Sequence, residues 1–165
     1  MTRAESIASI GTDDLAQIET LLKRYLQETS ARCAIVIDRT GRMLAVAGDT
    51  GGIDQTAFAS LAAADFAASD QLAVLLGERE FASLYHHGER QSMYLADADG
   101  WAILAALFDR RTTLGMVRIK TKGVVARLGR IFRDIAESGP SGSVVSMEVG
   151  WADDAESEID RLFTD

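Results

Sequence analysis

The chain has 165 residues, of which 47% are hydrophobic and 25% charged, the composition of an ordinary soluble globular protein with one domain. Its formal net charge of −8, from 25 acidic and 17 basic residues, argues against a nucleic-acid-binding protein, which needs an excess of Lys and Arg. The charge is uneven, because residues 110–133 carry eight basic side chains and no acidic one.

Cysteine content and hydropathy argue against a disulfide-bonded secreted protein and against a membrane-spanning protein. Cys33 is the single cysteine, so the chain forms no internal disulfide and no Cys-based metal cluster. The longest uninterrupted apolar run, residues 101–108, is too short to cross a bilayer, which takes about 20 helical residues. Residues 1–11 lack the apolar segment of a signal peptide, and we expect them to be disordered. These features predict a cytoplasmic protein with no membrane span.

In chain order, the first signal is a helix with Thr12 as its expected cap. Four apolar residues follow on one helical face, at spacings of three and four: Leu15, Ile18, Leu22 and Tyr25. Two short apolar runs, residues 33–38 and 42–47, then flank a Thr-Gly turn and predict a β-hairpin.

Residues 54–76 predict a long helix that ends at Gly77. One of its faces carries the large residues Phe58, Leu61, Leu72 and Leu76. The opposite face carries mainly small residues, namely Ser60, Ala63, Ala64, Ala67, Gln71 and Val74. A helix that is apolar all round is typically buried on both sides. The small-residue face is then covered either by the helix's own domain or, as we favour, by another subunit.

Three strands and another long helix follow. Residues 82–87, 92–96 and 101–108 are separated by turn sequences, including a strong Asp-Gly hairpin signal, and predict an antiparallel meander. A helical repeat at spacings of three and four comes next, formed by Leu114, Val117, Thr121, Val124, Leu128, Ile131 and Ile135. The basic residues lie between these positions, as they do on a solvated helix face.

The last segment differs in composition. Residues 138–150 are rich in Gly and Ser, hold the only proline and predict a linker. From Glu148 onward the chain carries seven acidic residues and one Arg. Apolar residues at helical spacing stand among them: Ala155, Ile159, Leu162 and Phe163. We therefore expect residues 151–165 to be an acidic tail with a short amphipathic helix that folds on a partner.

The order helix, two strands, helix, three strands, helix predicts an α+β domain over residues 12–137, with a five-stranded antiparallel sheet. No catalytic constellation accompanies it, and we expect no cofactor, no bound metal and no enzymatic activity. His86 and His87 are neighbours on a strand, so they point to opposite faces and do not easily share a metal. Asp65, on the large-residue face of the long helix, is either half-buried with a partner or part of a site.

Four stretches carry a family resemblance. They are Leu-Leu-Gly-Glu at 75–78 with Phe81, His-x-Gly at 86–88, Phe-Asp at 108–109 followed by Thr-x-Leu-Gly-x-Val-Arg at 112–118, and Glu-Ile-Asp-Arg-Leu-Phe at 158–163. Their order and spacing resemble the roadblock (dynein light chain) family, and its bacterial MglB branch in particular. The similarity runs from about residue 32 to residue 132 and returns at the tail, and it implies a roadblock-type sheet.

The resemblance implies a homodimer in which the long middle helices lie together and the two sheets join. It further implies that two subunits bind one MglA-like, Ras-like GTPase and stimulate GTP hydrolysis, with an influence on nucleotide exchange, in bacterial cell polarity or gliding motility. The family supplies no arginine finger, although Arg110 and Arg111 stand in a loop where they either mimic one or are simply solvated. The alternative is a roadblock dimer that serves as a binding scaffold without stimulating hydrolysis.

The resemblance also implies site residues. The family's partner surface uses small residues in the middle of the long helix, which match Ala64, Ala67, Ala68 and Gln71, with Gln71 bulkier than the family pattern. Together with the small-residue face, this predicts a partner or dimer interface at Ala63, Ala64, Ala67, Ala68, Gln71 and Val74. A separate contact of the tail with the GTPase is expected at Ile159, Leu162 and Phe163.

Overall fold

A computed structural model describes residues 9–146 of the chain. The helices are α2 (Thr12–Thr29), α3 (Gln55–Leu75) and α4 (Leu114–Ser138). The main strands are β2 (Cys33–Asp38), β3 (Met43–Gly48), β4 (Ser83–His87), β5 (Ser92–Ala98) and β6 (Ala102–Phe108). Two three-residue strands, β1 (Ser9–Gly11) and β7 (Val144–Ser146), stand at the two ends of the described chain. The predicted α+β fold with its order of elements is confirmed.

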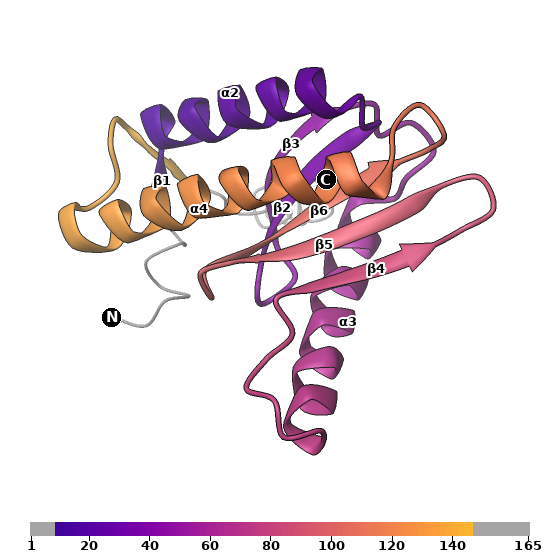
Figure 1. The fold of residues 1–165 in the computed structure, drawn as a ribbon. Coiled ribbons are helices and arrows are strands. Elements are labelled where there is room, and N and C mark those ends of the chain that lie inside the picture. The colour runs from indigo at the N-terminus through magenta and orange to yellow at the C-terminus, as the bar shows by residue number, and fades with distance from the viewer. Residues whose placement is uncertain (1–8, 147–165) are drawn as a thin grey trace, which may run out of the picture.

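The five-stranded sheet has the order β3-β2-β6-β5-β4, and every neighbouring pair is antiparallel. Helices α2 and α4 lie side by side on one face of it, and α3 lies on the other (Figure 1). The central strands β2 and β6 are buried at every residue, because helices cover both faces. Their uninterrupted apolar sequences therefore report burial on two sides rather than on one.

Two apolar clusters hold these layers together, one on each face of the sheet. Successive strand residues point to opposite faces, so Val36 and Leu104 pack toward α2 and α4, whereas Ile35 and Ile103 pack toward α3. The larger cluster lies between the sheet and the α2/α4 pair, and Phe132 of α4 is among its fully buried members.

The start of α2 corrects one expectation. The helix includes Thr12, so its N-cap is Gly11 rather than Thr12. The buried carboxylate of Asp14 supplies the missing acceptor, because its Oδ2 accepts hydrogen bonds from the backbone N–H groups of Gly11, at 3.2 Å, and Ser141, at 2.7 Å. One side chain thus caps the helix and fixes the segment that follows α4.

The two short strands correct the expected segment boundaries. The sequence predicts disorder over residues 1–11 and a linker over 138–150, but β1 and β7 pair antiparallel, with Ser9 opposite Ser146. The pairing joins segments more than 130 residues apart. A strand of three residues is too short for a recognisable hydrophobic pattern, so the sequence does not predict this pairing. The predicted tail residues Ile159, Leu162 and Phe163, with the rest of 151–165, lie outside the described residues.

Candidate partner interface

Helix α3 extends beyond the sheet, so that its C-terminal half projects from the body of the domain (Figure 1). Its inward face consists mostly of small residues, namely Ala59, Ala62, Ala63, Phe66, Ser69 and Ala73, all of them buried. Alanines at these positions let the helix axis approach the sheet closely, because they carry no side chain beyond Cβ. Phe66 is the single large side chain on this inward face and fills the remaining space.

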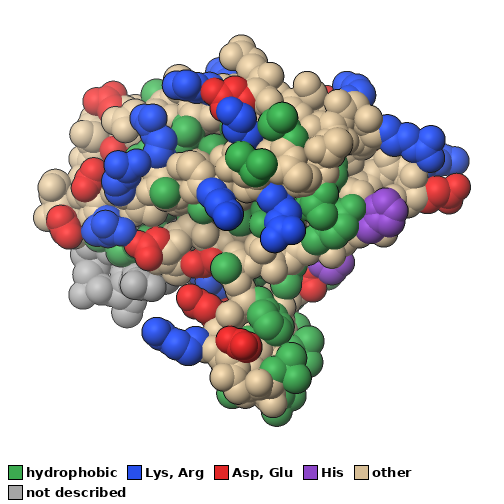
Figure 2. Space-filling view, viewed as in Figure 1, with side chains coloured by type: hydrophobic (Ala, Val, Ile, Leu, Met, Phe, Trp, Pro, Cys, Tyr) green, Lys and Arg blue, Asp and Glu red, His purple; other side chains and the backbone are tan. Residues whose placement is uncertain are grey.

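Two acidic residues of α3 (Gln55–Leu75), Asp65 and Asp70, are partly exposed and are paired with His86 and Arg39. The outward face of the helix carries no charge among its exposed residues. Its exposed members are Thr56, Ala57, Ser60, Leu61, Ala64, Ala67, Ala68, Gln71, Leu72, Val74 and Leu75, which we call the α3 outer face. Leu61 is 71% exposed and Leu75 81% exposed. Hydrophobic side chains gather on the projecting part of the molecule (Figure 2). A contiguous apolar surface of this kind marks a protein contact rather than a solvated helix.

The structure divides the predicted interface residues between the two faces of α3. Five of the six, Ala64, Ala67, Ala68, Gln71 and Val74, are exposed on the α3 outer face. Ala63 packs against the sheet instead and is only 6% exposed, so it is not available to a partner. Sequence reasoning left Leu61, Leu72 and Leu75 out of the interface, because Asp65 shares their side of the helix and no pattern in the sequence shows that these leucines are exposed.

An ion-pair cluster holds the projecting half of α3 to the sheet. Arg39, just after β2, donates a hydrogen bond from Nη1 to Oδ2 of Asp70 at 3.1 Å and also pairs with Asp97 on β5. Its guanidinium carbon lies 4.8 Å from the centroid of the Phe66 ring. These contacts of Arg39 link α3 to the sheet in addition to the apolar contacts of its inward face.

Strand β4 forms the edge of the sheet beside α3. It pairs with β5 on one side, and no other strand of residues 9–146 pairs with its second side. Nε2 of His86 lies 2.6 Å from Oδ2 of Asp65, so β4 and α3 are tied together. The sequence left two alternatives for Asp65, a half-buried residue with a partner or part of a site. The structure shows it partly exposed and paired with His86, as in the first alternative. An open strand edge next to the α3 outer face is a surface suited to a second subunit.

The two histidines point in opposite directions, as strand alternation predicts. His87 does not reach Asp65; its Nδ1 lies 3.0 Å from the Tyr85 hydroxyl and 3.3 Å from Oγ of Ser92. Within residues 9–146, no three His, Cys, Asp or Glu side chains are grouped so as to hold a metal ion. Cys33 is buried in β2, and desolvation raises the pKa of its thiol to about 11, so it is a poor nucleophile.

The loop between β6 and α4 contains the two candidate arginines. Nε of Arg111 donates to both carboxylate oxygens of Asp109, at 3.0 and 3.2 Å, and this pairing holds the pKa of Asp109 below its usual range. Arg110 is exposed and forms no ion pair with any residue of the described part of the chain. Arg110 is therefore the freer of the two to reach a bound partner.

By length and composition, α3 is also the one helix among residues 9–146 that could cross a membrane. Asp65 and Asp70 interrupt it, and both are bound to residues of the sheet or its loops. Its buried inward face and these ion pairs are the features of a helix packed in a folded domain.

Comparisons with known proteins place this arrangement among solved folds. Residues 17–108 match the family model described as Roadblock/LC7 domain. A comparison with curated protein sequences gave no significant match. MglB of Myxococcus xanthus is 34% identical, with a TM-score of 0.70 over 73% of this chain and 91% of that structure. The gliding protein MglB of Thermus thermophilus is also 34% identical, with a TM-score of 0.69 over 73% of this chain and 92% of its own.

Two further structures add context. One solved structure, also 34% identical, is described as MglB with a tetrameric arrangement. A Roadblock/LC7 domain from Streptomyces avermitilis has a TM-score of 0.64 over 70% of this chain and 97% of that domain. It is only 14% identical, so the likeness concerns the fold alone.

Proposed function

Because the chain belongs to the Roadblock/LC7 family, we propose that it is a non-enzymatic regulator of a small Ras-like GTPase of the MglA type. We propose that it acts as a homodimer in the cytoplasm, raises the rate of GTP hydrolysis by that GTPase, and serves cell polarity or gliding motility. The observation that carries this proposal is the α3 outer face, an exposed helix surface whose residues are uncharged and which Asp65, paired with His86, flanks.

The geometry supports a dimer built on α3 and β4. A two-fold axis beside β4 would pair its open edge with the same edge of a second copy, because antiparallel edges are self-complementary. The two α3 helices would then lie on the same side of the joined sheet, with His86 and Asp65 near the seam. The small residues Ala64, Ala67 and Ala68 would let two helices, or a helix pair and a GTPase, approach closely.

Such a regulator needs no catalytic group of its own. A partner that binds the hydrolysis-competent conformation of the GTPase more tightly than the resting one shifts the population toward it, and the GTPase's own residues carry out the reaction. On this mechanism, Arg110 contributes little. If Arg110 acted in trans as an arginine finger, its removal would instead cost several powers of ten in hydrolysis rate.

The proposal is tested by single-turnover GTP hydrolysis with a purified MglA-type GTPase and increasing amounts of this protein. We expect the rate to rise about tenfold or more at saturation, a barrier reduction of about 1.4 kcal/mol or more. The variant Arg110→Ala should keep this stimulation within about twofold. Loss of stimulation in Arg110→Ala, with binding intact, would identify an arginine finger.

The scaffold alternative gives a different result in the same assay. A chain that binds the GTP-loaded GTPase but leaves its turnover unchanged at saturation would be a roadblock scaffold and not an activator. A chain that does not bind the GTPase at all would contradict the activator and leave only a scaffold for another protein.

A further inference from the structure

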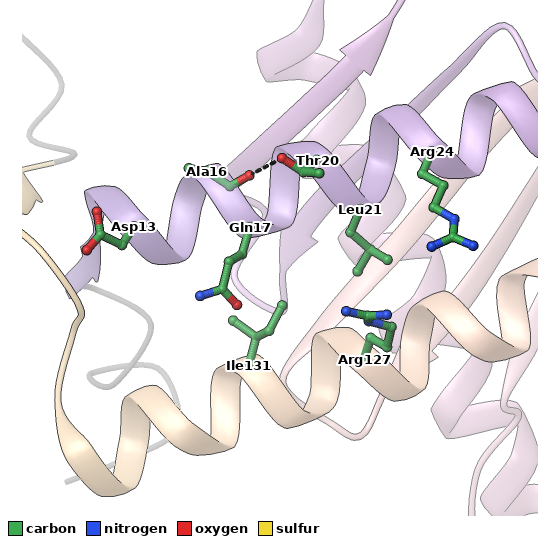
Figure 3. A pocket seen from close by; sticks show the side chains of 8 residues that line it. All are labelled: Asp13, Ala16, Gln17, Thr20, Leu21, Arg24, Arg127 and Ile131. Carbon is green, nitrogen blue, oxygen red and sulfur yellow. Dashed lines mark hydrogen bonds between the residues drawn. The ribbon is translucent and has the colours of Figure 1, made fainter.

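A groove runs between α2 and α4, on the face of the domain opposite α3. It consists of two adjoining hollows of about 470 Å³ and 360 Å³, whose shared walls are Leu21, Arg24 and Arg127. Figure 3 shows Gln17 and Leu21 of α2 facing Ile131 and Arg127 of α4 across the first hollow. We call this surface the α2/α4 groove.

The α2/α4 groove combines apolar and basic groups. Leu21 and Ile131 line its first hollow, and Ile119, 70% exposed, stands at its far end. Arg24, Lys120 and Arg127 are the cations of its walls. This mixture suits an amphipathic segment that carries acidic residues beside an apolar stripe.

The cations of the groove outnumber the carboxylates that could neutralise them. Arg24 and Lys120 share one carboxylate, Glu28, at 2.9 and 3.3 Å. Arg127 forms no ion pair with any residue between 9 and 146. The only other acidic side chain that the described residues place in the walls is Asp13, at the opposite end of the groove. Blue side chains are frequent over α2 and α4 in Figure 2.

The described chain ends close to one end of this groove. The backbone N–H groups of Thr12 and Asp13 donate to the carbonyl oxygens of Ser143 and Ser141, at 2.9 and 3.2 Å, and β7 pairs with β1 just before α2 begins. The chain thus passes the Asp13 end of the groove at Ser141–Ser143 and leaves β7 at Ser146, opposite Ser9. Ser9 precedes Asp13 by four residues, so this exit lies within about 14 Å of the Asp13 end.

The remaining sequence is long enough to fill the groove. Nineteen residues, 147–165, follow β7. Five residues in extended form span about 17 Å, and a helix of fourteen residues is about 21 Å long. The part of α2 from Asp13 to Glu28 is about 22 Å long. A short connection followed by a helix over residues 152–165 would therefore match the length of the groove.

We propose that the acidic tail, residues 151–165, docks in the α2/α4 groove of its own chain. Its apolar residues Ile159, Leu162 and Phe163 would lie on Leu21 and Ile131, and its carboxylates would neutralise Arg24, Lys120 and Arg127. While docked, the tail is not available to any other partner. The groove therefore competes with that partner for the tail and lowers the partner's apparent affinity for it. Docking itself is independent of the GTPase and of the proposed function.

The proposal is tested on the full-length chain by paramagnetic relaxation enhancement. Ser157→Cys places a nitroxide label in the tail, while Cys33 is buried and stays unlabelled, which the unmodified chain taken through the same labelling verifies. In about 50 mM salt we expect the backbone amide signals of Leu21, Arg24 and Arg127 to lose more than about half of their intensity. In about 1 M salt, where the Debye length is about 3 Å, the signals should recover.

Charge reversal provides the matched control. Arg24→Glu combined with Arg127→Glu should restore the signals. Arg118→Glu combined with Arg130→Glu, an equal change of charge on α4 outside the groove, should leave them attenuated. Full intensity at low salt, or attenuation on the α3 outer face instead, would overturn the proposal. A mixed sample distinguishes docking within one chain from docking between two chains. In it, the nitroxide is attached to copies without isotope labels, and the isotope-labelled copies carry no nitroxide. Attenuation seen only in this mixed sample would overturn the assignment to the same chain. The salt series on the Ser157→Cys chain decides the question even if the double variant fails to fold.

Discussion

At the scale of single residues, Asp14 has the most concentrated structural role. Its carboxylate is buried and accepts backbone hydrogen bonds from both Gly11 and Ser141, so one side chain serves two distant segments. The neighbouring Asp13 is exposed on the same helical turn and gives a matched comparison. The two residues are identical in type. They differ because Asp14, at the third helical position, reaches back to the N–H of Gly11 and also meets the returning chain at Ser141.

Replacing Asp14 by Ala should lower the free energy of unfolding by about 1–3 kcal/mol, because the buried N–H of Gly11 and the partly buried N–H of Ser141 lose their acceptor. Asp13→Ala should cost less than about 1 kcal/mol, since it removes only a favourable charge near the helix N-terminus. Urea unfolding followed by circular dichroism measures both. Equal losses in the two variants would show that the capping geometry contributes nothing.

Cys33 gives the protein a pH dependence on the alkaline side. Burial raises its pKa from 9.0 to about 11, so the unfolded chain releases this proton at a lower pH than the folded one. The free energy of unfolding is therefore unaffected by this thiol below about pH 9. It falls by about 1.4 kcal/mol per pH unit as the pH rises toward about 11. We expect Cys33→Ala to flatten the fall in stability between about pH 9 and 10, measured by urea unfolding with a reductant present. Parallel curves for the two proteins would contradict this.

At the scale of elements, α3 shows where sequence reasoning succeeds and where it stops. Its length and the capping Asp54, whose side chain accepts from the N–H of Ala57 at 3.0 Å, are readable from the sequence. Its orientation is not, because apolar residues surround the helix and periodicity marks no single inward side. The large residues Leu61 and Leu72 are exposed, and the inward side lies between the two predicted faces.

The α3 outer face is tested by Ala67→Arg. A long cation placed in a close helix contact should weaken GTPase binding at least about tenfold and can also shift the protein toward monomer, measured by titration calorimetry and analytical ultracentrifugation. The control is Ala126→Arg, at an exposed alanine of α4 on the other side of the sheet. Unchanged binding and unchanged mass for Ala67→Arg would show that the partner uses a different surface.

The strands show a similar division between local and distant information. Turn sequences between β4, β5 and β6 predict the meander, because a hairpin is a local structure. The pairing of β1 with β7 depends on residues at opposite ends of the chain and on Asp14, and no local pattern encodes it. The candidate interface was partly predictable for the same reason: the small residues of α3 stand out in sequence, but the leucines that accompany them and the β4 edge become neighbours only in the fold.

At the scale of the whole molecule, the net charge of −8 is a sum of opposite parts. The basic residues of α4 and the acidic tail could neutralise each other, and this complementarity is what the docking proposal uses. We expect the domain to fold without the tail, because the residues that the structure describes already form an apolar cluster on each face of the sheet.

Deletion of residues 151–165 should therefore leave the domain folded. We expect the far-ultraviolet circular dichroism per residue of the described elements to be retained and the midpoint of thermal unfolding to change by only a few degrees, as for a difference of about 1 kcal/mol. Loss of cooperative unfolding in the shortened chain would show that the tail belongs to the folding unit.

The pairing of Ser9 with Ser146 also bears on how the protein can be handled in cells. It brings both ends of the described chain together beside the start of α2, away from the projecting end of α3 (Figure 1). A fluorescent protein or affinity tag joined directly at residue 9 or residue 146 would attach on this side and leave the α3 outer face unobstructed. Such fusions at either of these two positions should be interchangeable for imaging the α3 contact.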